Sequence, residues 1–219
     1  MGPLARYPGL RSEAVLTDPE KKALHTRLSQ WGELSAANFS KVLALAELRS
    51  LAKHEFWSQP SAPVSHFAIV RSGLVRHYYV DSRGRESVKA FRGPGEFSAP
   101  YAEIILRKPS RTFIQALAPT ELLTFDVARF DALAEDSLEL QRLARRFVEQ
   151  HFVAKEQREY EFLQLSAEER YRQFCAERPE HLSHIPQHQV ASYIGITPVA
   201  LSRIRARGTK KKSLPARAK

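Results

Sequence analysis

Residues 187–206 read QHQVASYIGITPVALSRIRA, and this stretch decides how the end of the chain folds. Gly195 divides it into two helical halves, because glycine readily adopts the left-handed backbone that ends a helix. Thr197 can cap the second half, Pro198 suits its first turn, and Ala191 leaves room for two helices to approach closely. Apolar residues at helical spacing would hold the halves together: Val190, Ile194, Leu201 and Ile204. The stretch therefore predicts a helix-turn-helix, with the second helix ending at Gly208.

The second helix of this stretch would present one face to DNA. Val199, Ser202 and Arg203 share the face opposite the apolar one, together with Ala206. Arginine can bind guanine through two hydrogen bonds, valine can contact a thymine methyl group, and serine can bind a base or a phosphate. The remaining candidate DNA contacts, mostly to phosphates, are Gln187, His188, Gln189, Thr197, Arg205, Arg207 and Lys210. The prediction is a partner made of double-stranded DNA, and an ordinary pair of packed helices is the alternative.

The formal net charge of the sequence is +10, and the excess is concentrated near its end. From Arg203 onward there are eight basic residues and no acidic one. A basic cluster beside a helix-turn-helix is typical of a surface that binds nucleic acid. A solubilising tail is the alternative, because runs of charge are often simply solvated.

From Glu47 to Val127 the sequence changes to short runs rich in Val, Ile, Phe and Tyr, separated by turn residues. The runs are 64–70, 74–80, 86–91, 112–117 and 122–127. Strands of this length at this spacing predict an antiparallel β-roll or jelly roll. Two helices are expected before it, one beginning at Thr17 and one over 36–45.

Residues 137–165 contain neither proline nor glycine and predict one long helix. Its stripe repeats every three or four residues and consists of Leu140, Ala144, Phe147, His151 and Ala154. Leu140, Phe147 and Ala154 recur at seven-residue intervals, as in a helix that pairs with a second copy of itself. Packing of the stripe on the chain's own β-roll is the alternative. A further helix is expected after Ser166, where the residues SAEE form a capping box.

The predicted fold class is α+β, with an N-terminal antiparallel β-roll, a long dimerisation helix and a C-terminal helix-turn-helix. The four segments are a flexible arm at 1–16, the β-roll with its N-terminal helices at 17–130, the dimerisation helix at 131–165 and the helix-turn-helix domain with a basic tail at 166–219. Cys175 is the only cysteine, which excludes a disulfide framework and a cysteine-based metal or iron–sulfur site within one chain. The lack of a long apolar run and of a secretory core favours a cytoplasmic protein with no membrane partner.

Three stretches resemble the Crp/Fnr family of regulators. IPQ at 185–187, VASYIGIT at 190–197 and LSRI at 201–204 are similar to its DNA-reading motif, FAIVRSGLVR at 67–76 to its strand–glycine–strand hairpin, and GEF at 95–97 to the start of its ligand cassette. The resemblance implies a cyclic-nucleotide-binding-type β-roll that senses an effector and a homodimer formed through the 137–165 helix. It also implies a two-fold symmetric operator in DNA, and RNA polymerase as a further partner. The implied function is transcriptional regulation and not an enzymatic reaction.

The ligand cassette departs from the family pattern. Nucleotide-binding members place a glutamate for the ribose and, a short segment later, an arginine followed by serine or threonine for the cyclic phosphate. The matching types here are Glu96 and Arg111-Thr112, fifteen positions apart, with Phe97 and Ser98 as further candidate effector contacts. An arginine–phosphate fork tolerates little displacement, which argues against classical cyclic AMP binding, and no cofactor is assigned. The alternative role of Glu96 and Arg111 is a structural ion pair or the stabilisation of a turn.

Two other classes of function are compatible with parts of the pattern. One is a cyclic-nucleotide-like ligand-binding module that never touches DNA. The other is a metal-dependent jelly-roll enzyme, which needs clustered ligands, typically two histidines one residue apart and a carboxylate. His54, His66 and His77 lack that spacing, and haem ligation by them has no further support. No metal site and no catalytic residue are therefore expected.

Overall fold

The computed structural model describes residues 10–11 and 16–212 and divides into two compact units. The first unit takes the chain up to His77 and then Phe91–Lys155. The second takes Tyr78–Ala90 and the chain from Glu156 onward, so it joins a β-hairpin to the C-terminal helices. The predicted borders at 130 and 165 do not coincide with this division, because the long helix contributes residues to both units.

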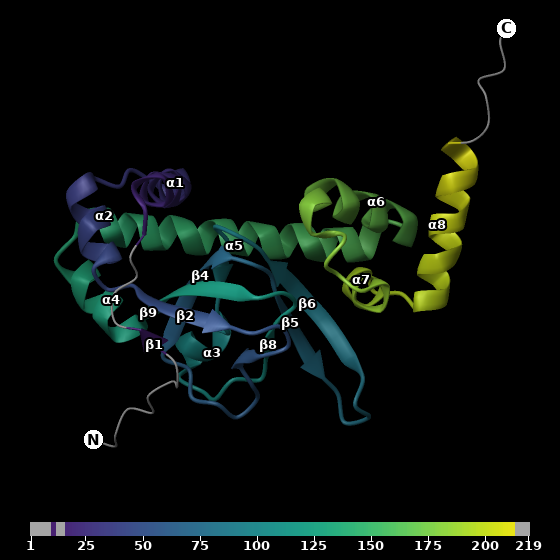
Figure 1. Cartoon of the computed structure of the whole chain (residues 1–219), viewed down its shortest axis with the longest axis horizontal. Helices are drawn as coiled ribbons and strands as arrows, with labels where there is room; N and C mark the ends of the chain where they lie inside the picture. The colour runs from purple at the N-terminus through teal and green to yellow at the C-terminus, as the bar shows by residue number, and fades with distance from the viewer. Residues whose placement is uncertain (1–9, 12–15, 213–219) are drawn as a thin grey trace, which may run out of the picture. The chain divides into compact units, whose positions relative to one another are not determined.

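The β-strands form two sheets, and every strand pairing that defines the larger sheet is antiparallel (Figure 1). The larger sheet has the order β1-β2-β9-β4-β7 and the smaller has the order β3-β8-β5-β6. The strands are β1 Leu10–Arg11, β2 Glu47–Leu51, β3 Phe56–Ser58, β4 His66–Ser72, β5 Val75–Val80, β6 Glu86–Arg92, β7 Phe97–Ser98, β8 Phe113–Ala116 and β9 Thr120–Asp126. The predicted antiparallel β-roll is confirmed, with small shifts at the strand ends.

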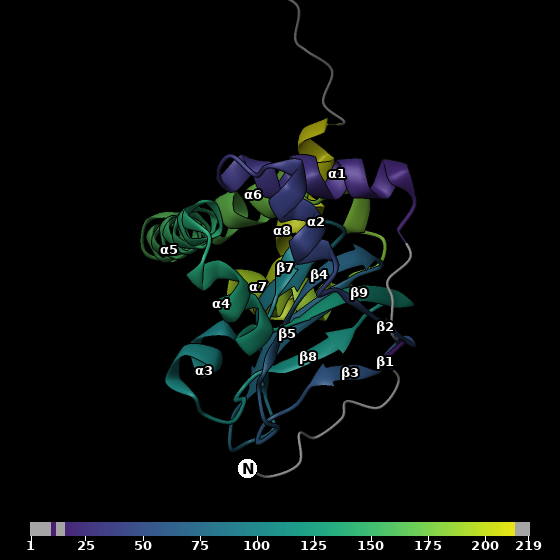
Figure 2. The same ribbon diagram turned by 90° about the vertical axis from the view of Figure 1, so that its left-hand side faces the viewer.

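Strand β4 shows how the larger sheet acquires two apolar faces. Ala68 and Val70 pack with Leu122 in a cluster between the sheets. Ile69 points the other way because successive side chains of a strand alternate, and it pairs in register with Leu123 of β9. Both residues belong to a second cluster of buried side chains, to which several helices contribute. Figure 2 shows the ribbons of these helices beside the sheet. These helices are α1 Asp18–Leu28, α2 Ala36–Leu43, α4 Val127–Glu135 and the first half of α5 Leu138–Gln164. Helices that precede the sheet in the sequence and helices that follow it therefore cover its outer face together.

The predicted helix over 131–165 is two helices, α4 and α5. The hydroxyl of Ser137 accepts a hydrogen bond from the backbone N–H of Leu140 at 3.3 Å, which starts α5 independently of α4. The predicted arm also differs from expectation where it is described, because Leu10–Arg11 pairs with β2 and Leu16 is buried in the core. The rest of the arm and the basic tail beyond Lys212 lie outside the described residues.

The second unit contains α6 Ala167–Glu177, the 3-10 helix η2 Pro179–His181, α7 Gln187–Ile194 and α8 Pro198–Lys212. Ser166 caps α6 in the predicted capping box with Glu169. Helix α8 continues through Gly208, where its end was predicted, because one glycine costs only about 1 kcal/mol relative to alanine within a helix. No helix in the described part of the chain combines the length and the apolarity that a membrane crossing needs.

Candidate nucleic-acid interface and ligand sites

The corner between α7 and α8 is built around Gly195. Its φ is +76°, and a Cβ at this position would lie 2.6 Å from Cε1 of Phe162, so neither the backbone nor the space accepts a side chain. Thr197 Oγ1 then accepts the backbone N–H of Ala200 at 3.2 Å and starts α8. The residues that join the two helices are at most 1% exposed: Val190, Ala191, Ile194 and Leu201. The predicted turn, the cap and the contacts of Val190, Ile194 and Leu201 are confirmed, whereas Ile204 is only half-buried.

Two arginines that no sequence motif marks hold this corner. Arg158 donates a hydrogen bond to the backbone oxygen of Tyr193 at 2.8 Å, and its guanidinium lies 3.9 Å from the centre of the Tyr193 ring. Arg170 donates to the backbone oxygen of Ile194 at 3.0 Å. Both guanidinium groups also lie over the Phe162 ring, at 4.8 and 5.0 Å. Cations at the carbonyl end of a helix interact favourably with its dipole, so Arg158 and Arg170 stabilise the end of α7.

The face of α8 that was predicted to read DNA is exposed. Val199 is 62% exposed, and Ser202, Arg203 and Ala206 are exposed as well. These positions share one side of a helix with 3.6 residues per turn, and the buried Leu201 lies on the other side. Arg203 therefore stands on an accessible surface, beside a hydroxyl and a methyl-bearing side chain, where its parallel N–H groups can pair with a planar acceptor.

The remaining predicted DNA contacts lie in different surroundings. Gln187, His188, Thr197, Arg205 and Arg207 are exposed. Gln189 is only 7% exposed, because the third position of α7 faces the interior. The prediction that Gln189 contacts a phosphate is therefore not supported. Arg205 contacts Tyr171 of α6: burial raises the pKa of Tyr171, and Arg205 acts in the opposite direction. The side chain of Lys210 lies outside the described residues.

In the first part of the predicted effector cassette, Glu96 stabilises the turn in which it lies. Glu96 accepts the backbone N–H of Gly93 at 2.7 Å through Oε2, and its Oε1 lies 3.9 Å from Nη1 of Arg92. The hydroxyl of Ser98 lies 2.8 Å from Nε2 of His77, and both side chains are buried. These contacts support the structural alternative for Glu96.

The second part of the cassette is occupied by a carboxylate of the same chain. Arg111 donates through Nε to Oε1 of Glu103 at 2.9 Å. The Glu103 side chain is 2% exposed whereas that of Arg111 is 71% exposed, so the arginine neutralises a buried charge from the surface. Thr112 is fully buried, and its hydroxyl has no hydrogen-bond partner among the described atoms. A cyclic phosphate would have to compete with Glu103 for Arg111.

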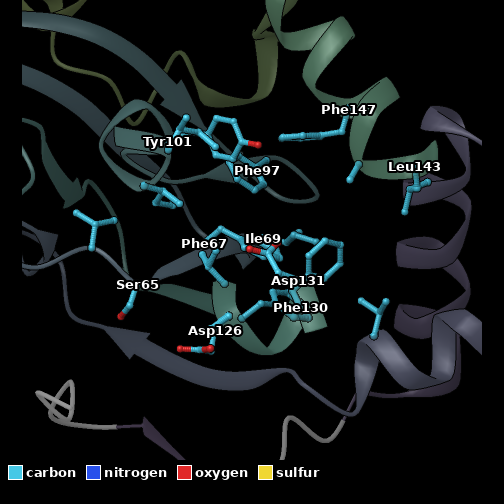
Figure 3. Close-up of a pocket in the computed structure, with 18 of the residues that line it drawn as sticks. Ser65, Phe67, Ile69, Phe97, Tyr101, Asp126, Phe130, Asp131, Leu143 and Phe147 are labelled. Carbon is cyan, nitrogen blue, oxygen red and sulfur yellow. The ribbon is translucent and has the colours of Figure 1, made fainter. Parts of the chain in front are cut away.

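A cavity of about 590 Å³ lies in the first unit, against the outer side of β4 and β9. Side chains from the sheet, α3 (Tyr101–Leu106), α4 and α5 line it, and its aromatic residues include Phe67, Phe97, Tyr101, Phe125, Phe130 and Phe147. Figure 3 shows Phe97, Tyr101 and Phe147 gathered at one side of it. Of the five predicted effector contacts, Phe97 lines the cavity, whereas the polar members of the cassette are not among its lining residues.

Helix α5 has two apolar sides. Leu140, Leu143 and Phe147 are buried in the first unit, at 0, 6 and 8% exposure, so the predicted self-pairing seam through Leu140 and Phe147 is covered by the chain's own β-roll. A different side carries exposed apolar residues: Leu138, Val148, Phe152, Val153, Tyr160 and Leu163. Phe152 is 62% exposed and Leu163 is 72% exposed. If α5 pairs with a second copy, this exposed side is the one available.

The β-hairpin of the second unit is tied to α7 through Ser192. The Ser192 hydroxyl accepts the backbone N–H of Val88 at 2.9 Å and donates to the backbone oxygen of Glu86 at 3.1 Å. Ser192 thus acts as an extra partner for the backbone of β6. The helix-turn-helix and the tip of the hairpin consequently form one packed unit.

Comparisons with known proteins agree with this architecture. Residues 48–137 match the family described as cyclic nucleotide-binding domain. FixK2 from Bradyrhizobium japonicum is 21% identical, with 80% of this chain and 89% of that chain covered and a TM-score of 0.64. The regulator CLP from Xanthomonas campestris, described as c-di-GMP responsive, is 16% identical, with 84% and 96% covered and a TM-score of 0.64. For the catabolite activator protein of Thermus thermophilus these values are 18%, 88%, 91% and 0.54.

Comparison with curated protein sequences gives no significant match. At these identities the similarity to solved structures concerns the fold, and the family match concerns residues 48–137. Together they confirm the predicted β-roll followed by a long helix and C-terminal helices. Residues 48–137 of this chain thus match the cyclic nucleotide-binding domain family, and the fold of the chain is similar to that of regulators of the Crp/Fnr family.

Proposed function

We propose that this protein is a sequence-specific DNA-binding transcriptional regulator that acts as a homodimer in the cytoplasm. The observation that carries the proposal is the α7–α8 corner, whose interior is fully packed while Val199, Ser202 and Arg203 remain exposed on one face of α8. The shared fold with FixK2, CLP and the catabolite activator protein supports it.

In this proposal α8 enters the major groove with its N-terminal residues first. Arg203 would bind O6 and N7 of a guanine, and Val199 would contact a thymine methyl group. Gln187 and His188 at the positive end of the α7 dipole, together with Arg207, would hold phosphates and so fix the register of α8. A two-fold symmetric dimer would read two half-sites roughly 34–36 Å apart.

The DNA-binding proposal is tested by fluorescence anisotropy on the upstream region of the gene at several salt concentrations. Arg203→Ala should weaken specific binding by about 1–3 kcal/mol and leave binding to random DNA nearly unchanged, because a base contact carries sequence information. Arg207→Ala is the matched control, which should weaken both kinds of DNA about equally and lower the salt dependence. An equal loss on both DNAs for Arg203→Ala would remove its base-reading role. If the parent chain binds no DNA, the protein is a ligand-binding module instead.

The dimer proposal rests on the exposed apolar side of α5. Phe152→Asp should raise the dimer dissociation constant by about thirtyfold, because an aromatic anchor in an interface contributes about 2 kcal/mol. Gln150→Asp is the matched control, since it adds the same charge at an exposed position off the apolar side. Analytical ultracentrifugation measures both variants. A monomeric parent chain, or equal weakening by the two substitutions, would contradict pairing through this side.

A further inference from the structure

We propose that the cavity between the outer face of the sheet and helices α3, α4 and α5 binds a neutral, mainly apolar small molecule of about two aromatic rings. The binding itself is independent of DNA, and only its regulatory meaning rests on the proposed function. The site is separate from the nucleotide cassette, with which it shares Phe97 but none of the polar residues.

The volume and the walls of the cavity suit such a ligand. Small-molecule sites typically enclose about 300–1,000 Å³, and this cavity has about 590 Å³. The cavity opens partly to solvent and its lining is mostly apolar, so a ligand would replace water there with dispersion contacts to the walls. The Phe97 ring centre lies 4.5 Å from that of Phe147 and 5.9 Å from that of Tyr101. The walls thus offer edges and faces of rings at the spacing at which aromatic groups pack.

The charges at the cavity argue against an anion. Three ionisable side chains besides Tyr101 line it: Asp126, Asp131 and Arg107. Asp126 is partly engaged, because its Oδ1 accepts the backbone N–H of Arg129 at 2.9 Å. The sum of the three charges is still one net negative charge, which disfavours carboxylates and phosphates. The anionic cyclic nucleotides and fatty acids are therefore poor candidates. The Tyr101 hydroxyl supplies a group that can orient a polar substituent of a neutral ligand.

The test uses the full chain and two fluorescent probes that differ by one sulfonate group. N-phenyl-1-naphthylamine is neutral, and 1-anilinonaphthalene-8-sulfonate is its anionic analogue. Ala144→Phe fills the cavity from α5, and Ala154→Phe places the same ring at an exposed position of the same helix. Ile104→Phe fills the cavity from α3 and guards against a defect peculiar to α5. Far-UV circular dichroism and a thermal melt establish that each variant is folded.

The expected result is saturable binding of the neutral probe, weakened about tenfold or more by Ala144→Phe and by Ile104→Phe and unchanged by Ala154→Phe. That factor corresponds to about 1.4 kcal/mol of lost contact. The component of binding that the two filling variants remove should have a lower affinity for the anionic probe than for the neutral probe. Asp131→Asn should reduce this difference in affinity, because it removes a negative charge from the cavity.

Several outcomes would overturn the proposal. One is a neutral probe that does not saturate, and another is binding that persists in both filling variants. The charge argument would be wrong if the binding that Ala144→Phe and Ile104→Phe remove were stronger for the anionic probe than for the neutral one. If Ala144→Phe changes the oligomeric state instead of probe binding, the cavity is covered by a second copy of the chain. If the parent chain binds the neutral probe but binds no DNA, the proposed function is refuted and this inference still holds.

Discussion

The α7–α8 corner and the segment from Glu96 to Thr112 use their charged side chains in opposite ways. At the corner, Arg158 and Arg170 hold the end of α7 while Arg203 is left on the exposed face of α8. In the segment, Glu96 binds its own turn and Arg111 pairs with Glu103. One region keeps a cation accessible to an outside partner, and the other satisfies its charges internally. A charged residue of the right type therefore indicates a ligand only when its fixed neighbours leave it available.

The largest effect is expected at the corner, from Gly195→Ala. Gly195 and Gly84 have nearly the same φ, +76° and +77°, but a Cβ at 195 meets Phe162 whereas nothing lies within 4 Å of one at 84. Alanine in this conformation costs about 1–2 kcal/mol, and the clash adds about 1–3 kcal/mol. Urea unfolding should show the larger loss for Gly195→Ala, with DNA binding lost as well.

Gly84→Ala is the matched control for backbone strain alone. The double variant Gly195→Ala with Phe162→Ala should recover the part of the loss that comes from the clash. Equal losses for the two glycine variants would show that the corner needs only the left-handed backbone and not the close approach of Phe162.

An intermediate effect is expected in the segment from Arg111→Ala. It leaves the buried Glu103 carboxylate without its cation and should lower the free energy of unfolding by about 1–2 kcal/mol, a value reduced because Arg111 itself is mostly exposed. Lys108→Ala, at a nearby exposed position, should change it by less than about 0.5 kcal/mol. Calorimetric titration of the parent chain with cyclic AMP should give no saturable heat. If the parent chain bound cyclic AMP saturably and Arg111→Ala abolished that binding, Arg111 would be a ligand contact as in the family pattern. The contrast with the α7–α8 corner would then be wrong.

The smallest effect concerns pH and His151, whose ring centre lies 5.7 Å from that of Phe97. Burial lowers the pKa of His151 below its ordinary 6.5, and Arg92 and Lys155 add to this. The unfolded chain then binds the proton more readily, so stability present above about pH 6.5 is lost as the pH falls toward the folded pKa. His151→Gln should flatten the decline of the thermal midpoint between about pH 7 and pH 5, and the exposed His184→Gln should not. Parallel curves for the parent and both variants would contradict this assignment.

The corner could be predicted because its determinants are local. A glycine, a cap and a proline within four positions act on the backbone of their own neighbourhood. The partners of Arg158 and Arg170 are backbone carbonyls, which no side-chain pattern marks. Gln189 resembled a phosphate contact because it is polar and near a helix start, and only packing shows that its position faces inward.

The α5 helix and the cavity show what a linear pattern leaves undecided. Two apolar sides run along α5, and periodicity alone does not say which of them the β-roll covers. The cavity is space left between elements that are distant in the chain, from β4 to α5, so it has no motif. Residue type alone marks the cassette in the sequence. Nothing in the sequence marks Glu103 as the partner of Arg111, because a glutamate in a short apolar helix resembles a surface residue.

The contact between Gly195 and Phe162 has a genetic consequence. The gap between the turn and an aromatic ring on α5 is too narrow for a methyl group, so the angle of α8 depends on a side chain outside the face that is proposed to contact DNA. Variants at position 162 would then behave in a screen like defects in operator choice. Suppressors of Gly195→Ala would be recovered at that same distant codon.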